Sequence, residues 1–149
     1  MAARDSGGAG VGYGAPAAVG AALANRKHGR LTVNIQCDGD LNYAPAVLWT
    51  AAHHKIPLLT VMHNNRAYHQ EVMHLQRMAN RHNRGVTRAA IGTTIENPNI
   101  DFAAMARSMG VHAEGPVTDP KDLAPAIRKA LAVVKAGQPA LVDVVSQPR

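Results

Sequence analysis

Two oxygen-bearing side chains, Asp38 and Asn65, have the types and positions of a metal-binding pair. Asp38 directly follows the segment 31–37, and Asn65 lies 27 positions later, behind the apolar segment 58–62. A carboxylate and an amide carbonyl suit a hard cation such as Mg²⁺, which usually completes its shell with phosphate oxygens and water. The pair therefore predicts a divalent metal site that also takes a phosphate-bearing ligand.

Glycines on both sides of Asp38 favour a close approach of the backbone to that ligand. Gly39 permits a sharp turn and exposes backbone N–H groups at the start of a helix, where phosphate binds well. Upstream, five of the first fourteen residues are glycine, at positions 7, 8, 10, 12 and 14. Asp-Gly-Asp and Asn-Asn could each be no more than a turn. Their positions after two strands, with a glycine loop upstream, favour a metal–diphosphate clamp.

Alternating strands and helices must bring these residues together. Strands are predicted over 31–37, 58–62, 111–114 and 141–145, and helices over 17–25, 44–54, 100–109 and 120–135. The segment 71–80 has helical character, and 85–99 is expected to be a loop. Asn99 and Asp119 are expected to cap the helices that follow them.

This order predicts an α/β fold, a three-layer, doubly wound, mostly parallel sheet with helices on both faces. Ligands of such sheets lie beyond the carboxyl ends of the strands. Asp38 and Asn65 would therefore reach one crevice if their strands are neighbours.

Composition limits the class of protein. The 149 residues suit one domain, and no apolar run reaches the length of a membrane span. The single cysteine, Cys37, excludes an internal disulfide framework and favours a reducing compartment, so we expect a soluble, cytoplasmic protein.

A basic segment contributes to the formal net charge of +6. Five arginines lie between positions 66 and 88, against one acid, Glu71. Such a segment could attract nucleic acid, an anionic cofactor or an acidic partner, or it could be a solvated helix face. Nucleic acid is the least favoured of these, because the segment lacks a series of aromatic side chains on which bases stack.

The motifs resemble those of a known family. Cys37-Asp38-Gly39-Asp40, followed at a matching distance by Asn64-Asn65, looks like the thiamine diphosphate signature Gly-Asp-Gly…Asn-Asn. The run 7–18 resembles the preceding loop of the acetolactate synthase and benzoylformate decarboxylase group. The resemblance spans nearly the whole chain and implies a C-terminal cofactor-binding (PP-type) domain over residues 1–149.

The resemblance implies thiamine diphosphate bound through Mg²⁺. The protein ligands of the metal would be the side chains of Asp38 and Asn65 and the carbonyl of Ala67. The cofactor would be bound by backbone groups of the turn after the first strand and by the glycine loop, at Gly39, Asp40, Gly10, Val11 and Gly12, with Asn65 acting through the metal. The loop would meet the aminopyrimidine ring, and Val11 or its neighbour would be the apolar wedge that bends the cofactor.

Three positions depart from the family pattern. Cys37 replaces the first glycine of the signature, and Ala67 stands where glycine is common, which a carbonyl ligand tolerates. Asp40 stands where serine or alanine is more usual. A carboxylate beside a diphosphate would be repelled unless it points away or joins the metal shell.

The family implies a decarboxylase or carboligase acting on 2-oxo acids, of the acetolactate synthase kind. Its cofactor is activated by a glutamate from a separate pyrimidine-binding domain, usually on another subunit. None of the glutamates in this chain, Glu71, Glu96 and Glu114, lies in a suitable motif, so no catalytic residue is assigned. We expect either a fragment of a longer polypeptide, favoured by the early start of the glycine loop, or a subunit inactive without a partner. Both imply a homo- or hetero-oligomer.

Overall fold

The computed structural model describes residues 10–147, and its elements follow the expected order. The strands are β1 (Val33–Cys37), β2 (Leu59–Asn64), β3 (His112–Val117) and β4 (Ala140–Val145). The helices are α1 (Gly14–Arg26), α2 (Asp38–Leu41), α3 (Val47–His53), α4 (His69–Arg81), α5 (Phe102–Ser108) and α6 (Pro120–Lys135). The expected break after the first strand is the short helix α2.

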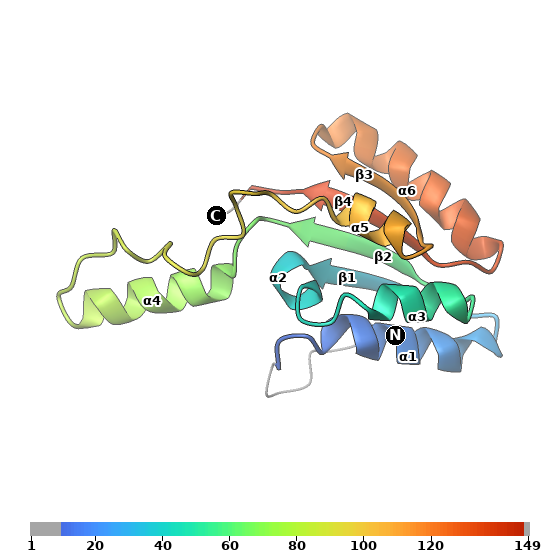
Figure 1. Ribbon diagram of the computed structural model, residues 1–149, viewed down its shortest axis with the longest axis horizontal. Helices are drawn as coiled ribbons and strands as arrows, with labels where there is room; N and C mark the ends of the chain where they lie inside the picture. Colours follow the sequence, from blue (N-terminus) through green and yellow to red (C-terminus); the bar gives the residue numbers. More distant parts are fainter. Residues whose placement is uncertain (1–9, 148–149) are drawn as a thin grey trace.

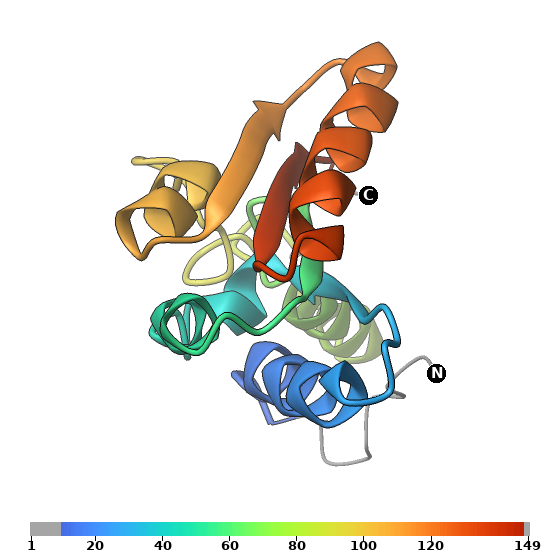
Figure 2. The same ribbon diagram turned by 90° about the vertical axis from the view of Figure 1, so that its right-hand side faces the viewer.

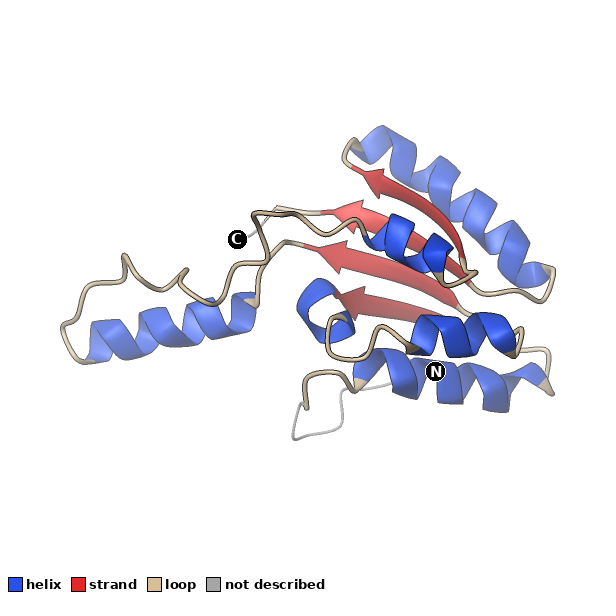
Figure 3. Ribbon diagram, viewed as in Figure 1, coloured by secondary structure: helices blue, strands red, loops and turns tan. Residues whose placement is uncertain are grey.

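The four strands form one parallel sheet in the order β1-β2-β4-β3, and their arrows point the same way in Figure 3. Helices α3 and α5 lie on one side of the sheet and α6 on the other (Figures 1 and 2). The expected α/β class, with a parallel sheet between helices, is confirmed. The strands before Asp38 and Asn65 are neighbours, with Cys37 opposite His63.

Apolar clusters on both faces of the sheet hold the layers together. On one face, Met62 and Leu141 pack with Phe102 of α5. On the other face, Leu59 and Val142 pack with side chains of α6. The central strands are therefore covered on both faces, which agrees with the nearly unbroken apolar run of the second strand.

One of the two predicted helix caps is confirmed, and the other is wrong. Asp119 caps α6 as expected, since its side chain accepts a hydrogen bond from the N–H of Lys121 at 3.0 Å. The prediction for Asn99 is wrong, because Asp101 is the cap of α5 and accepts from the N–H of Ala104 at 2.6 Å. Helix α5 accordingly begins at Phe102 rather than at position 100.

Strand β1 carries its apolar side chains on an uncovered face. Val33 and Ile35 are 49% and 68% exposed, whereas Gln36 is buried on the opposite face. Helix α6 packs over β3, β4 and β2. The usual alternation of apolar residues inward and polar residues outward is thus inverted in this edge strand.

Helix α4 projects from the body of the domain, and the segment 82–99 returns beside it (Figure 1). No residue of α4 is buried. The base of this arm is held by backbone hydrogen bonds, from Tyr68 N–H to the Thr93 carbonyl at 2.8 Å and from Ile95 N–H to the Arg66 carbonyl at 2.7 Å. Within the described part of the chain, no helix has the length and apolar character needed to cross a bilayer.

Candidate functional site

Asp38 and the turn 65–67 meet at the carboxyl ends of β1 and β2. Asp38 Oδ2 accepts a hydrogen bond from the N–H of Arg66 at 2.6 Å, and Oδ1 accepts from the N–H of Gly39 at 2.8 Å. Asn65 Oδ1 accepts from the N–H of Ala67 at 3.1 Å. The structure therefore brings together the three positions expected to bind a metal.

The backbone of the turn is shaped around the Asp38 carboxylate. Arg66 adopts a left-handed conformation with φ 58°, which costs a non-glycine residue about 1–2 kcal/mol. Backbone hydrogen bonds from both Arg66 and Ala67 reach Asp38. Unfavourable backbone geometry that is held by tertiary contacts is typical of functional sites.

The electrostatics of Asp38 suit a bound cation. Its side chain is buried, and burial raises its pKa, against the opposing effect of the backbone hydrogen bonds from Gly39, Arg66 and Ala67. Among the ion pairs formed within residues 10–147, none includes Asp38. A buried carboxylate is costly unless it is compensated, and a cation would compensate it.

The donor set is rich in oxygen and poor in histidine and cysteine. Across the described residues, no group of three or more His, Cys, Asp or Glu side chains is placed to hold a metal ion. The oxygen donors gathered at this site are instead the carboxylate of Asp38 and the amide oxygen of Asn65. These donors fit Mg²⁺ better than a transition metal.

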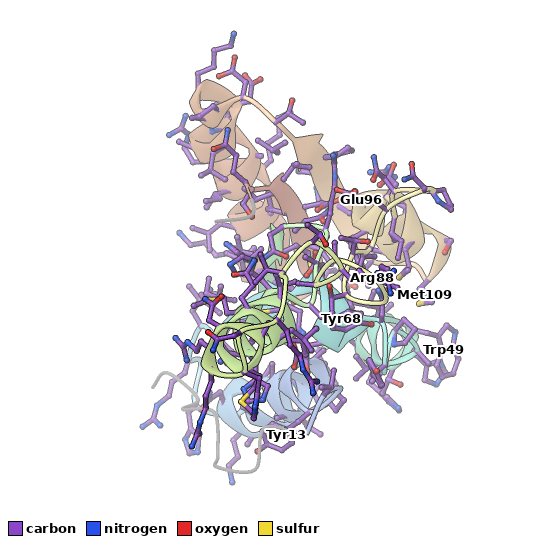
Figure 4. The ribbon with its side chains drawn as sticks, turned by 90° about the vertical axis from the view of Figure 1, so that its left-hand side faces the viewer. Tyr13, Trp49, Tyr68, Arg88, Glu96 and Met109 are labelled. Carbon is purple, nitrogen blue, oxygen red and sulfur yellow. The ribbon has the colours of Figure 1, made fainter. Side chains whose placement is uncertain are left out.

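Gly39 lies directly beneath the ring of Tyr68. A Cβ atom at Gly39 would stand 2.5 Å from Cε1 and 2.6 Å from Cδ1 of Tyr68, so no larger residue fits without displacing the ring. The Tyr68 ring contacts Tyr43 edge-to-face, with centroids 6.2 Å apart. Burial, followed by the nearby Tyr43, raises the pKa of Tyr68. Figure 4, viewed from the carboxyl ends of the strands, shows Tyr68 where α4 joins the body of the domain.

Neither Tyr68 nor Tyr43 was predicted from the sequence to be a site residue. A signal was present, because the chain has only three tyrosines and Tyr68 follows the Asn-Asn motif closely. An aromatic residue next to a motif in a chain so poor in aromatics is a candidate for a site wall.

The glycine loop begins with a tight turn. The N–H of Tyr13 donates to the carbonyl of Gly10 at 3.1 Å, and Gly12 has φ 95°, as the third position of a type II turn requires. Val11, the expected apolar wedge, is 46% exposed. Positions 7 and 8 lie outside the described residues. Contact of Gly10, Val11 and Gly12 with a cofactor ring stays a prediction.

The Asp40 carboxylate faces this loop. It accepts hydrogen bonds from the N–H groups of Gly12 and Gly14, at 2.6 Å and 3.1 Å, and from the side-chain amide of Gln36 at 2.5 Å. The Asp38 carboxylate is instead bound by Gly39 and the 65–67 turn. The two acids of the Asp-Gly-Asp motif therefore have separate sets of partners.

A second buried carboxylate, Asp143 of β4, lies behind the site. It accepts from the side-chain amide of Asn64 at 3.1 Å and from the N–H of Phe102 at 3.2 Å, and it is fully buried. It thus links β4 to the residue before Asn65 and to the start of α5. Asp143 was not predicted from the sequence, although an acid within the apolar run 141–145 is a recognisable signal of a buried polar network.

Comparison with known proteins identifies relatives of this chain. Residues 2–144 match the family described as thiamine pyrophosphate enzyme, C-terminal TPP binding domain. Over 138 residues, the chain is 35% identical to benzoylformate decarboxylase of Pseudomonas aeruginosa, covering 93% of this chain and 23% of that protein. It is 38% identical, also over 138 residues, to the acetolactate synthase large subunit-like protein IlvX of Mycobacterium tuberculosis, covering 93% of this chain and 25% of that protein.

A solved structure shows the same likeness. The thiamine diphosphate-dependent 4-hydroxybenzoylformate decarboxylase of Rhodococcus jostii RHA1 superposes with a TM-score of 0.70 at 31% sequence identity. The match covers 93% of this chain and 23% of that one. The chain therefore spans about a quarter of the length of these relatives.

Proposed function

The chain belongs to the thiamine pyrophosphate enzyme family, as a C-terminal TPP-binding domain, and from this we propose that it binds thiamine diphosphate through Mg²⁺ within an enzyme acting on 2-oxo acids. The supporting observation is the 65–67 turn, which wraps the buried Asp38 carboxylate and holds Asn65 beside it. The similarity to benzoylformate decarboxylase and to an acetolactate synthase-like protein supports a decarboxylase or carboligase.

Two parts of the site have separate tasks in this proposal. Asp38, Asn65 and the Ala67 carbonyl bind the metal, which tethers the diphosphate and neutralises its charge. Backbone groups of Gly39 and Asp40 bind the diphosphate, and the loop at Gly10, Val11 and Gly12 contacts the ring. When bound, the cofactor supplies the carbanion stabilisation that 2-oxo acid chemistry requires.

Replacing Asp38 by asparagine tests the metal site. We expect Asp38→Asn to weaken binding of Mg²⁺ with thiamine diphosphate by about 10- to 100-fold, because a charge-assisted interaction is worth about 1.5–3 kcal/mol. Calorimetric titration of the protein as it is encoded, with any copurifying subunit, measures this change. Asp122→Asn, at an exposed acid of α6, is the control of equal charge. Equal affinity in wild type and Asp38→Asn would contradict the proposal.

We further propose that the activating glutamate comes from a pyrimidine-binding domain in the same polypeptide or in another subunit. The chain spans only about a quarter of its relatives, which leaves room for such a domain in them. The bare face of β1 and the projecting α4 are surfaces that a larger assembly would cover. Turnover of the 149-residue chain, with and without that domain, tests this proposal.

A further inference from the structure

We propose that Asp40 is a positioning residue that fastens the glycine loop 10–14, whose last residue begins helix α1, to the start of helix α2 at Asp38 and Gly39. Asp40 would thereby set the ring-binding part of the cofactor site relative to the metal-binding part. The expected effect of Asp40 on cofactor binding rests on the proposed function. Its geometry, however, consists of contacts within the chain.

Both oxygens of the Asp40 carboxylate are engaged by the loop. Oδ1 accepts from the N–H of Gly12 at 2.6 Å, and Oδ2 accepts from the N–H of Gly14 at 3.1 Å. These donors lie 28 and 26 positions earlier in the chain. Hydrogen bonds to an ionised carboxylate are roughly twice as strong as neutral ones, so one side chain connects two distant segments firmly.

A row of polar side chains on the covered face of β1 holds Asp40 in this orientation. The amide of Gln36 donates to Asp40 Oδ2 at 2.5 Å, and its own oxygen accepts from the Asn34 amide at 2.9 Å. Gln36 is 1% exposed, so its polar groups must find partners inside the protein. The inverted alternation of β1 therefore has a purpose in this proposal: polar residues face inward to position Asp40.

The loop lies so close to Asp40 that glycine is required. A Cβ atom at Gly14 would stand 2.6 Å from Asp40 Oδ2 and 3.1 Å from Gln36 Oε1. A Cβ atom at Gly12 would stand 2.9 Å from the Cβ of Tyr43, and φ at Gly12 is positive as well. The glycines allow the backbone to approach the carboxylate, and the carboxylate fixes the conformation that the glycines permit.

The positioning of the glycine loop depends on aspartate at position 40. The family resemblance places serine or alanine at this position more often than aspartate. Alanine has no acceptor, and serine has a single short one, whereas the two oxygens of aspartate reach the N–H groups of Gly12 and Gly14 together. The Asp40 carboxylate, which a diphosphate would repel, thus accepts hydrogen bonds from the loop instead of facing the diphosphate.

Two probes of different length separate a positioning role from direct binding. Inorganic pyrophosphate with Mg²⁺ requires only the metal end of the site, whereas thiamine diphosphate with Mg²⁺ also requires the loop. We expect Asp40→Ala to weaken thiamine diphosphate binding at least about tenfold and pyrophosphate binding less than about twofold. Asp40→Asn, which keeps one acceptor, should restore part of the loss. Asp38→Ala should weaken both probes alike.

Amide hydrogen exchange of the loop tests the fastening without any cofactor. In Asp40→Ala, the amides of Gly12 and Gly14 should exchange at least about tenfold faster, whereas amides of β4 should keep their protection. If Asp40→Ala fails to fold, Asp40→Ser provides the same comparison with a smaller change. Both measurements use the protein as it is encoded, with any copurifying subunit.

The outcomes distinguish this inference from the proposed function. Equal losses for both probes in a folded Asp40→Ala variant would make Asp40 a direct ligand and overturn the positioning role. Unchanged thiamine diphosphate affinity, or unchanged exchange at Gly12 and Gly14, would overturn it too. Failure of the wild-type protein to bind either probe would refute the proposed function, even where the exchange data confirm the fastening itself.

Discussion

Two buried carboxylates of this domain differ in the groups that compensate their charge. Asp38 and Asp143 are both buried carboxylates whose pKa is raised by burial. Asp38 is surrounded by backbone N–H groups at the proposed metal site. Asp143 has a side-chain amide and backbone N–H groups from the start of α5 as its partners, which suits a structural link rather than a ligand.

Replacing Asp143 by asparagine should destabilise the domain in a pH-dependent manner. Asparagine keeps one acceptor and presents an amide to a buried donor, which costs about 1–3 kcal/mol. In the wild type, the folded-state pKa of Asp143 lies above the ordinary value of 3.8, so the contribution of Asp143 to the free energy of unfolding falls as pH rises from that value through the folded-state pKa. The penalty of Asp143→Asn should therefore be largest at acid pH and smaller, but constant, above the folded-state pKa.

Urea unfolding at several pH values measures this difference, with Asp122→Asn as the exposed control. A penalty that does not vary with pH would show that the pKa of Asp143 is not raised. A penalty that grows with pH would show that it is lowered.

Motif spacing located some site residues but not others. The order of strands placed Asp38 and Asn65 at the ends of two neighbouring strands, and the family resemblance added Ala67. The partners of the Asp40 carboxylate in the glycine loop were not predictable, because they are backbone N–H groups more than twenty positions away. Such partners depend on how closely two segments approach in space.

Elements were predicted best where local chemistry and tertiary packing agree. Helix α6 has its Asp119 cap, a proline at its start and Gly137 with φ 87° at its end, and it matches the predicted range. Strand β1 was found from its composition, but its bare apolar face was not. Which face of an edge strand is covered depends on whether helix α6 reaches it, and no local pattern contains that information.

Removing the cap of α5 should weaken that helix measurably. The Asp101 side chain accepts from the N–H of Ala104, and loss of such a cap costs about 0.5–2 kcal/mol. Asp101→Ala should lower the free energy of unfolding by that amount, measured by urea denaturation. Asn99→Ala, at the cap that the sequence suggested, should change it by less than about 0.5 kcal/mol. The reverse ranking would restore Asn99 as the cap.

At the scale of the whole molecule, two surfaces are left exposed by the described residues of the chain. Ile35 and Val33 present apolar side chains on the open face of β1, and α4 extends away from the core without a buried residue. Both surfaces lie on elements that adjoin the proposed cofactor site, since β1 ends at Cys37, directly before Asp38, and α4 begins after the 65–67 turn. A covering domain would therefore contribute to the site as well as to stability.

We predict that the chain alone binds the cofactor but does not turn over a substrate. The 149-residue chain alone should bind Mg²⁺ with thiamine diphosphate yet show no decarboxylation of benzoylformate or pyruvate, because no glutamate motif for cofactor activation is present in it. Adding a pyrimidine-binding domain, in the same polypeptide or as a separate chain, should restore turnover. Full turnover by the chain alone would refute the need for that domain.

The same substitution in two contexts tests whether the β1 face is covered. Ile35 is 68% exposed in this domain, so Ile35→Lys should change the stability of the chain alone by less than about 0.5 kcal/mol. In the assembled enzyme, where we propose that this face is covered, the buried lysine should cost about 2 kcal/mol or more and slow assembly. Thermal unfolding of both forms measures the contrast. An equally small effect in the active assembly would place the covering domain elsewhere, with α4 as the remaining surface for it.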